Sequence, residues 1–333
     1  MKPFLILSTL VIAATLAAQA GAAKVPVFGA DAGQSGVAGP GGDRFVTLPA
    51  GADTILAAVQ QRSGEISSYR RLPGRYTIPA VAYDGTAGGL SADGRTLVLT
   101  RPRLRFPRAE SSFLVVDTRT LRTTRRLMLR ADWSFDAISP DGRYLYLIEY
   151  TDPRDTSRYA VRLYDLTRGR LAPEPIVDPH EADEAMRGSP LTRVSSPDGR
   201  WEYTLYDGGG KEPFVHALDT VGRTARCIDL EELAWLIGSD MSQLRMRLRD
   251  GALVVDAGGS PFLRIDTTTF AVREPAPATS VEPAVPAEPD RGGWWIPVLT
   301  ALVLAAILGL AVLGRLPRLA RPWRSRSSAT PNP

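Results

Sequence analysis

The stretch SPDGRYLYLIEY, residues 139–150, decides the fold. An Asp-Gly pair, Asp141-Gly142, precedes a short run of Tyr, Leu and Ile. Tight turns favour this pair, because Asp accepts hydrogen bonds from the backbone amides that follow it and Gly tolerates positive φ. Short apolar runs beside such turns are typical of strands. The stretch therefore predicts a turn followed by a β-strand.

The same pattern recurs along the chain. Its Asp-Gly pairs are Asp93-Gly94, Asp141-Gly142, Asp198-Gly199 and a degenerate copy, Asp250-Gly251. A second signature, an apolar strand that ends in aspartate, follows each pair, with its aspartates at Asp117, Asp165, Asp219 and Asp266. The glycines are separated by 48, 57 and 52 residues, and the second aspartates by 48, 54 and 47. Two signatures that keep one period indicate a repeated supersecondary unit.

The length of the repeat indicates its architecture. Four short strands fit in roughly 40–50 residues, the size of one blade of a β-propeller. The Asp-Gly turns define four blades, and residues 45–82 supply apolar runs for a fifth, whose turn is degraded to Gly51-Ala52-Asp53. We predict an all-β fold, a propeller of five or six four-stranded blades, with an open β-sandwich as the alternative. Closure of the ring requires a strand near residues 45–48 to pair into the last blade.

These motifs resemble a known group of proteins. The Ser-Pro-Asp-Gly-Arg turns at 139–143 and 196–200, with their apolar strands and the Val-Val-Asp-Thr segment at 115–118, are similar to those of bacterial exported propellers. The group comprises the YVTN, Trp-Asp-repeat-like and Tol-system propellers, and the resemblance covers about residues 45–272. No copy contains the full Tyr-Val-Thr-Asn, and the Asp signature lacks Trp-Asp. The resemblance implies a propeller that serves as a binding platform or scaffold, and occasionally as an enzyme.

Both ends of the chain predict export and anchoring. Residues 1–23 contain Lys2, an apolar run and small residues, the pattern of a cleaved signal peptide. Residues 294–314 carry no charged side chain and, as a helix, would span about 31 Å, enough to cross a bilayer. Five arginines and no acid follow in residues 315–333, which predicts a cytoplasmic tail. We therefore expect a single-pass cell-membrane protein with its propeller outside; a buried core helix is the alternative for 294–314.

The remaining segments follow from composition. Residues 24–43 are rich in Gly and Ala without periodicity, and we expect a flexible leader. Residues 44–273 form the predicted propeller ectodomain. Residues 274–293 alternate proline with alanine and acids, which favours an extended stalk.

The charge excludes one class of partner. The chain has a net charge of +4, but five positive charges lie in the tail and one in the signal, which leaves about −2 for the rest. We therefore expect no nucleic-acid binding by the outer domain. The single cysteine, Cys227, cannot form an internal disulfide, and we expect it to be a small buried residue in a strand.

The densest polar cluster lies at residues 178–184. Its Asp178, His180 and Glu181 would suit a divalent cation or acid–base chemistry, but the run lacks fixed ligand spacing. Asp-Pro followed by acids also starts short helices, which is the alternative structure. We name these three residues as weak catalytic candidates and predict no metal and no cofactor. His216, inside an apolar strand, is expected to be structural.

Two further segments have simpler interpretations. The glycine-rich residues 208–211 lack the features of a phosphate-binding loop and are expected to form a hairpin loop. The arginine-rich residues 101–108 are expected to be a solvated face, with a partner-binding patch as the alternative.

Two functions from different classes remain. The first is a membrane-anchored binding, sensing or scaffold module without catalysis, whose partner is an extracytoplasmic protein, glycan or small ligand and whose bilayer contact is residues 294–314. The second is an exported hydrolase or lyase that uses carboxylates of a propeller face. The location of Asp178, His180 and Glu181 discriminates between them. On the outer rim they would not support the enzyme, whereas at the axis, with acids from other blades, they would.

Overall fold

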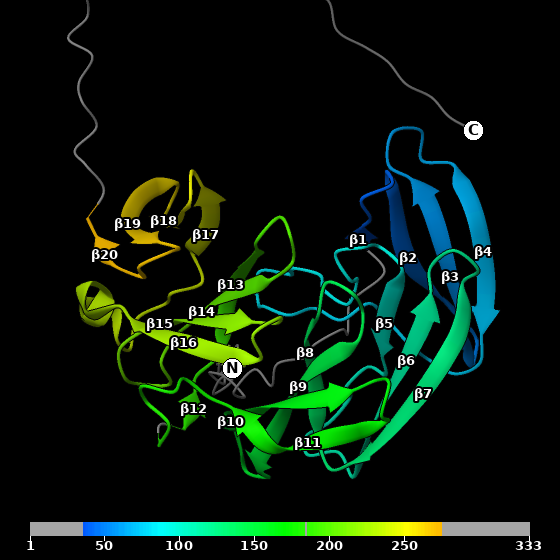
Figure 1. Cartoon of the computed structure of the whole chain (residues 1–333), viewed down its shortest axis with the longest axis horizontal. Helices are drawn as coiled ribbons and strands as arrows, with labels where there is room; N and C mark the ends of the chain where they lie inside the picture. The colour runs from blue at the N-terminus through cyan, green and yellow to red at the C-terminus, as the bar shows by residue number, and fades with distance from the viewer. Residues whose placement is uncertain (1–35, 184, 275–333) are drawn as a thin grey trace, which may run out of the picture. The chain divides into compact units, whose positions relative to one another are not determined.

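The structure is a computed structural model that describes residues 36–183 and 185–274 (Figure 1). These residues belong to one compact unit, Met1–Ala276, and a second unit, Pro277–Pro333, lies outside the described residues. The described part contains twenty strands and one 3-10 helix, η1 (Glu231–Leu236).

The strands form five antiparallel sheets in chain order. The first sheet contains β1 (Val37–Ala38), β2 (Asp43–Ala50), β3 (Asp53–Gln60) and β4 (Ile66–Leu72). The second contains β5 (Thr96–Thr100), β6 (Glu110–Asp117) and β7 (Arg122–Arg130). The third contains β8 (Trp133–Ile138), β9 (Tyr144–Asp152), β10 (Asp155–Asp165) and β11 (Arg170–Ile176), with β12 (Met186–Arg187) paired to β10. The fourth contains β13 (Pro190–Ser195), β14 (Trp201–Tyr206), β15 (Phe214–Asp219) and β16 (Thr224–Asp229), and the fifth contains β17 (Leu244–Arg249), β18 (Ala252–Ala257), β19 (Ser260–Asp266) and β20 (Val272–Arg273).

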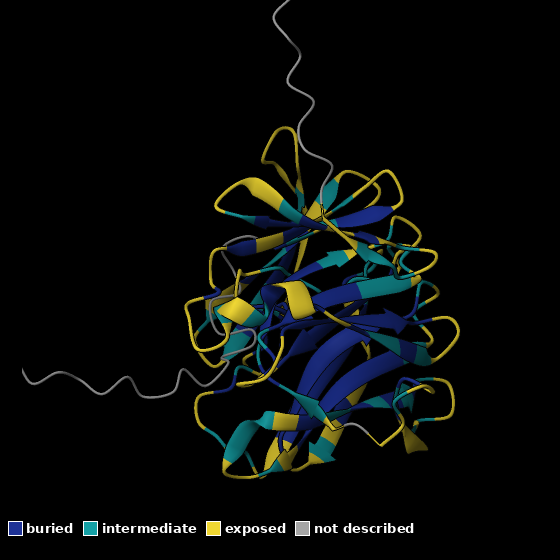
Figure 2. Cartoon of the chain, turned by 90° about the vertical axis from the view of Figure 1, so that its left-hand side faces the viewer, coloured by how far each residue is buried: buried dark blue, intermediate teal, exposed yellow. Residues whose placement is uncertain are grey.

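Each sheet packs on the next through buried side chains, and buried strands dominate the interior (Figure 2). The hydrophobic clusters join the first sheet to the second, the second to the third, the third to the fourth and the fourth to the fifth. Leu56 and Leu97, for example, share the first cluster, and Val215 and Val255 share the last. The predicted all-β architecture of successive blade-like sheets is confirmed. The sheets contain three to five strands, however, and not four throughout.

The second sheet has three strands because its first segment is irregular. Leu90 forms only an isolated bridge with Leu97, and Thr77 another with Thr100. Gly89 in this segment has a φ of +97°, which a side chain rarely adopts. A continuous strand along β5 is therefore interrupted.

The two repeated signatures are bonded to each other within a sheet. The register places the start of the strand after the Asp-Gly turn opposite the second aspartate, as in Thr96 opposite Asp117. The threonine after that aspartate then reaches the turn, and Thr118 Oγ1 donates to the carbonyl oxygen of Gly94 at 2.6 Å. The two signatures keep the same period along the chain because they contact each other within each repeat.

The second aspartates also organise the turns that follow them. Asp219 Oδ1 accepts the backbone N–H groups of Val221 and Gly222 at 3.0 and 2.7 Å. Burial opposes its ionisation, but the hydrogen bond from Arg200 and these N–H donors outweigh burial and lower the pKa of Asp219.

The first sheet corrects two expectations. Strand β1 lies within the predicted leader 24–43, so the sheet begins before residue 44. Its Asp-Gly equivalent is the turn at residues 39–42, where Gly39 N donates to the Asp43 carbonyl at 2.7 Å, as Ser139 N does to Tyr144 at 2.8 Å. Gly51-Ala52 instead joins β2 to β3. The sequence analysis did not predict this turn because residues 39–42 lack the Asp-Gly pair.

The predicted closure strand pairs elsewhere. Phe45 lies opposite Val37 on β1 and Ala58 on β3, so residues 45–48 belong to the first sheet. Between residues 36 and 274, apart from residue 184, no strand of the first sheet pairs with a strand of the last.

The predicted membrane elements are not covered by the structure. No helix within residues 36–183 and 185–274 has the length and hydrophobicity that a bilayer span requires. The signal 1–23, the stalk beyond Glu274, the span 294–314 and the tail 315–333 lie outside the described residues.

Candidate binding cavity at the inner edges of the sheets

The first strands of the sheets face the middle of the described unit (Figure 1). Three of the five sheets, together with the segment before β5, line a cavity of about 370 Å³ there, which we call the inner-edge cavity. Its walls come from β1 and the turn after it, residues 86–92, the second half of β8, and the segment from β13 to the start of β14. Most of these side chains are small, so backbone and a few polar groups determine what the cavity accepts.

A buried ion pair spans two of these strands. Arg193 on β13 donates through Nη2 to Oδ1 of Asp136 on β8, and through Nη1 to the carbonyl oxygen of Asp136. Its Nε donates to Thr204 Oγ1 at 2.7 Å. Asp136 is 1 % exposed and Arg193 is 7 % exposed. Burial disfavours the guanidinium charge, but the carboxylate outweighs burial and raises the pKa of Arg193. The pair thus ties the third sheet to the fourth.

The pair leaves one oxygen unused. Oδ2 of Asp136 is buried and has no hydrogen-bond partner in the part of the chain that the structure describes. Arg193 uses three of its five N–H groups in these bonds, so one N–H on each terminal nitrogen remains. The unused oxygen of Asp136 is a buried acceptor in the same wall.

Glu202 adds a second carboxylate to the same wall. It lies on β14, is half-buried, and accepts the Ser195 hydroxyl at Oε2 over 2.6 Å. Burial raises the pKa of Glu202, and Arg193 opposes this only in part. Asp136, Glu202 and Arg193 are the charged residues of the lining, which gives the cavity a net charge of −1 when all three are ionised.

Sequence reasoning did not identify these three residues. The available signal is a charged side chain inside an otherwise apolar strand, as in the runs WSFDAI of β8 and PLTRVS of β13. Such residues are costly to bury unless they are paired, and the partner is 57 positions away.

The predicted catalytic candidates lie elsewhere. Asp178 directly follows β11, the last strand of the third sheet, and its Oδ2 accepts the N–H of Cys227 on β16, the last strand of the fourth sheet, at 2.9 Å. His180 is bonded to Asp178 through its backbone N–H and its Nδ1, both 2.9 Å from Oδ1. Its side chain is 72 % exposed. The cluster is therefore at the outer edges of the sheets, away from the inner-edge cavity.

The local backbone of this cluster differs from the expected short helix. Glu181 N donates to the Asp178 carbonyl at 3.1 Å, which closes a turn, and no helix is assigned to residues 178–183. Burial opposes ionisation of Asp178, but hydrogen bonds from His180 and Cys227 outweigh it and lower the pKa of the carboxyl.

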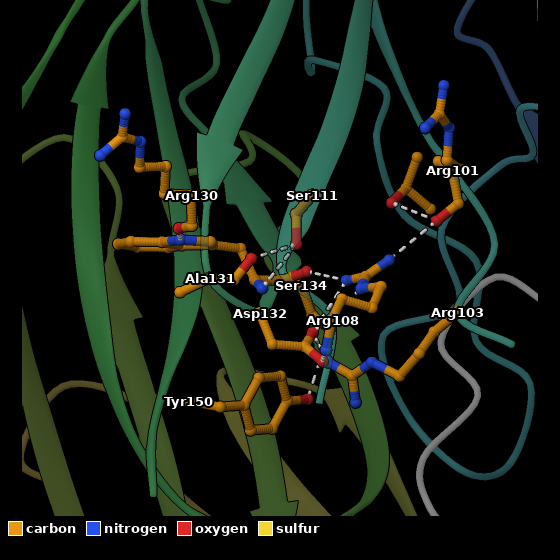
Figure 3. A network of polar contacts seen from close by, with 11 residues as sticks. Arg101, Arg103, Arg108, Ser111, Arg130, Ala131, Asp132, Ser134 and Tyr150 are labelled. Carbon is orange, nitrogen blue, oxygen red and sulfur yellow. Dashed lines mark hydrogen bonds and ion pairs between the residues drawn. The ribbon is translucent and has the colours of Figure 1, made fainter. Parts of the chain in front are cut away.

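The arginine-rich stretch 101–108 is only in part the solvated face that we expected, because Arg101 and Arg105 are exposed but Arg103 is buried. Figure 3 shows Arg103 and Arg108 directed at Asp132. Arg103 Nη2 lies 2.8 Å from Asp132 Oδ1, and the guanidinium of Arg103 lies 4.2 Å from the centre of the Tyr150 ring. Arg108 donates its backbone N–H to Asp132 Oδ2 at 2.8 Å. The expectation of a solvated face is wrong for Arg103 and Arg108, because a buried acid, 29 residues from Arg103, binds both side chains.

The glycine-rich loop lies where the sequence placed it. Residues 207–213 connect β14 to β15, which pair as a hairpin. Asp207 Oδ1 accepts the N–H of Gly209 at 2.9 Å and that of Ser189 at 2.8 Å. The loop is thus a structural hairpin connection.

Comparison with known proteins adds context for the fold. No protein-family model matches the chain, and no curated protein matches it. Similar solved structures include one from a study of two prolyl endopeptidases, with 15 % identity over 72 % of this chain and 35 % of that chain, and a TM-score of 0.40. The chain therefore spans about a third of that structure.

Two further structures are similar. The Swd1 β-propeller domain of Myceliophteria thermophila has 13 % identity over 70 % of this chain and 67 % of that chain, with a TM-score of 0.40. TolB from Acinetobacter baumannii has 16 % identity over 70 % of this chain and 56 % of that chain, with a TM-score of 0.33. Similarity at these TM-scores assigns no function to the chain.

Proposed function

We propose that the five-sheet unit is a non-catalytic binding module, and that its ligand is a small polar molecule carrying an ammonium group, bound in the inner-edge cavity. The observation that supports this is the cavity itself, which is concave, is built by three sheets and the segment before β5, and places two carboxylates against one arginine that is already ion-paired. Cavities with a few convergent polar groups are the usual form of a ligand site.

The charges favour a cation. Arg193 is neutralised locally by Asp136, so Glu202 carries the uncompensated charge of the wall. A positively charged group beside a partly buried carboxylate gains more than it would in water, because the local dielectric is lower. An anionic ligand would meet two acids, and Arg193, the one cation of the lining, is already paired with Asp136.

The residues that motivated the enzyme alternative do not lie at the inner edges of the sheets. It depended on Asp178, His180 and Glu181 converging with other acids at the inner edges, and these residues lie at the outer edges of β11 and β16. We therefore do not pursue a hydrolase or lyase that uses them.

The membrane context is part of the same proposal and is supported by sequence. The signal-like residues 1–23, the uncharged residues 294–314 and the five arginines after them would place the module outside the bacterial cell membrane. The YVTN-like turn motifs support the same setting, and an extracytoplasmic protein or glycan is the alternative partner. Deletion of residues 294–314 is expected to move the chain from the membrane fraction to the soluble exported fraction.

Ligand binding is tested by a thermal-shift screen of the full chain in detergent. The panel contains primary and quaternary amines, neutral isosteres of the same size and matched carboxylates. We expect only amines to raise the melting temperature, and this rise to disappear in Glu202→Gln. The matched control is Glu65→Gln, an exposed glutamate between β3 and β4, which should keep the response. No response to any amine, or the same response in Glu202→Gln, would contradict the proposal.

A further inference from the structure

A second, smaller cavity lies between the third and fourth sheets at their outer edges. It measures about 20 Å³ and is lined by Asp178, Glu181, His216 and Cys227, among others. A space of roughly 10–15 Å³ is enough for one water molecule, so this cavity has room for a single small occupant. Asp178 and Glu181 follow β11, whereas His216 and Cys227 come from β15 and β16. The lining thus joins two neighbouring sheets.

The donor atoms converge. One ligand atom each from Asp178, Glu181 and Cys227 lies within 4.8 Å of the others. Nδ1 of His216 lies 3.9 Å from the Cys227 sulfur. The ligand atoms of a tetrahedral zinc site are roughly 3.5 Å apart, given Zn–S of about 2.3 Å and Zn–N or Zn–O of about 2.0–2.2 Å. The atoms of Asp178, Glu181 and Cys227 are up to 4.8 Å apart, so an ion would have to draw them closer together.

The imidazole of His216 gives an independent indication of a ligand. The residue is 2 % exposed, and its Nε2 has no hydrogen-bond partner among the residues that the structure describes. Its Nδ1 lies 3.9 Å from the Cys227 sulfur, so Nε2 is the nitrogen left to bind an occupant of the cavity that His216 lines. Buried polar groups normally have partners, so an imidazole satisfied this poorly by the protein is explained by an occupant of the cavity.

The surrounding contacts are those of a supported metal site. The N–H of Cys227 and the Nδ1 of His180 hold the two oxygens of Asp178, each at 2.9 Å. Such second-layer contacts orient ligating carboxylates. Arg226 Nε lies 3.6 Å from the same Oδ2 and would compete for it. Since a thiolate and an imidazole favour zinc over calcium and magnesium, the donor set also selects the metal.

We propose that Asp178, Glu181, Cys227 and His216 bind one Zn²⁺ ion, which links the third sheet to the fourth. This site is separate from the inner-edge cavity, so it does not depend on the proposed ligand function. Zn²⁺ serves there as a cross-link, because four protein ligands leave no open position for a substrate.

The test uses Co²⁺ as a spectroscopic probe on the reduced full chain in detergent after chelator treatment. We expect one equivalent to produce visible absorption of tetrahedral cobalt and a near-ultraviolet thiolate-to-cobalt band, and Zn²⁺ to abolish both. Because Cys227 is the only cysteine in the chain, the thiolate band reports this site alone. Cys227→Ser should remove the band.

Further variants distinguish a specific four-ligand site from nonspecific metal binding to the Cys227 thiol. His216→Phe keeps the ring volume and should weaken cobalt binding at least about tenfold, as should Asp178→Asn. Asp183→Asn, an exposed acid in the same turn, is the control and should bind normally. Circular dichroism verifies folding. If these ligand variants misfold, the wild type alone decides, since Zn²⁺ but not Mg²⁺ should raise its melting temperature.

Two results would overturn the proposal. One is a folded wild type that shows neither a thiolate–cobalt band nor a Zn²⁺-dependent rise in melting temperature. The other is a band that is unchanged in both His216→Phe and Asp178→Asn. Neither result bears on amine binding in the inner-edge cavity, which is measured with different ligands and variants.

Discussion

The hydroxyl oxygen of Thr220 lies 3.0 Å from the carbonyl oxygen of Gly199, and its hydrogen is shared between this acceptor and the neighbouring Arg200 carbonyl at 2.9 Å. Gly199 ends one repeated signature and Thr220 follows the other, so this bond joins the Asp-Gly turn to the strand that returns beside it. Thr118 and Thr267 make the same bond to Gly94 and Gly251. The recurring contact gives the repeat its physical basis.

Replacing this threonine tests its contribution. Thr220→Val keeps the shape of the buried side chain but removes the donor, and should lower the free energy of unfolding by about 1 kcal/mol, since a part-buried carbonyl loses its partner. Urea unfolding measures the change. Thr167→Val, at an exposed position after β10, should remain within about 0.5 kcal/mol of the wild type. Equal losses in both variants would show that the bond has no special role.

The second aspartate of the repeat makes stability depend on pH. The folded-state pKa of Asp219 is lowered, so its contribution is complete above the unfolded value of about 3.9 and is lost as the pH falls through the folded value. We expect the melting temperature to fall below about pH 4, and to fall less steeply in Asp219→Asn. Melting curves from pH 2 to pH 7 measure this, and parallel curves for the two proteins would contradict it.

Replacement of the buried acid Asp132 should lower the free energy of unfolding strongly. Asp132→Ala leaves Arg103 buried with its ion-pair partner removed, and breaking such a pair costs roughly 3–5 kcal/mol. Arg105→Ala, an exposed arginine of the same stretch, should cost less than about 0.5 kcal/mol. Urea unfolding of both variants is the measurement. A mild effect of Asp132→Ala would mean that water replaces the pair.

The ionised side chain of Glu202 should lower the stability of the fold while it binds the ligand. Burial raises its pKa, so the folded state disfavours the ionised side chain and loses stability as the pH rises above the unfolded value. At neutral pH, Glu202→Gln should therefore raise the melting temperature, by roughly 2–4 °C if the gain is about 1 kcal/mol. Calorimetry at pH 7 tests this, and a lower melting temperature would show that the ionised carboxylate stabilises the fold.

The sequence predicted those parts of the fold that depend on local chemistry. The Asp-Gly turns and the aspartates that accept turn amides occur where the repeats predicted them, because each needs only neighbouring residues. The turn at residues 39–42 was not predicted, because glycines and a proline form it without the repeated aspartate.

The parts that could not be predicted depend on distant partners. Arg103 is buried because Asp132 lies opposite it, and Arg193 because Asp136 does, across 29 and 57 positions respectively. The sequence around each arginine does not indicate which distant aspartate it pairs with. The same holds for Asp178, which approaches Cys227 only when the third and fourth sheets pack together, whereas His216 lies opposite Cys227 on the neighbouring strand.

The most direct test of the proposed function is calorimetric titration of the full chain and its Glu202→Gln variant with one amine that raises the melting temperature. The account predicts that the variant binds at least about tenfold more weakly, which corresponds to about 1.4 kcal/mol, and that wild-type affinity increases as Glu202 loses its proton. Equal affinity in the two proteins would contradict the assignment of the inner-edge cavity as the ligand site.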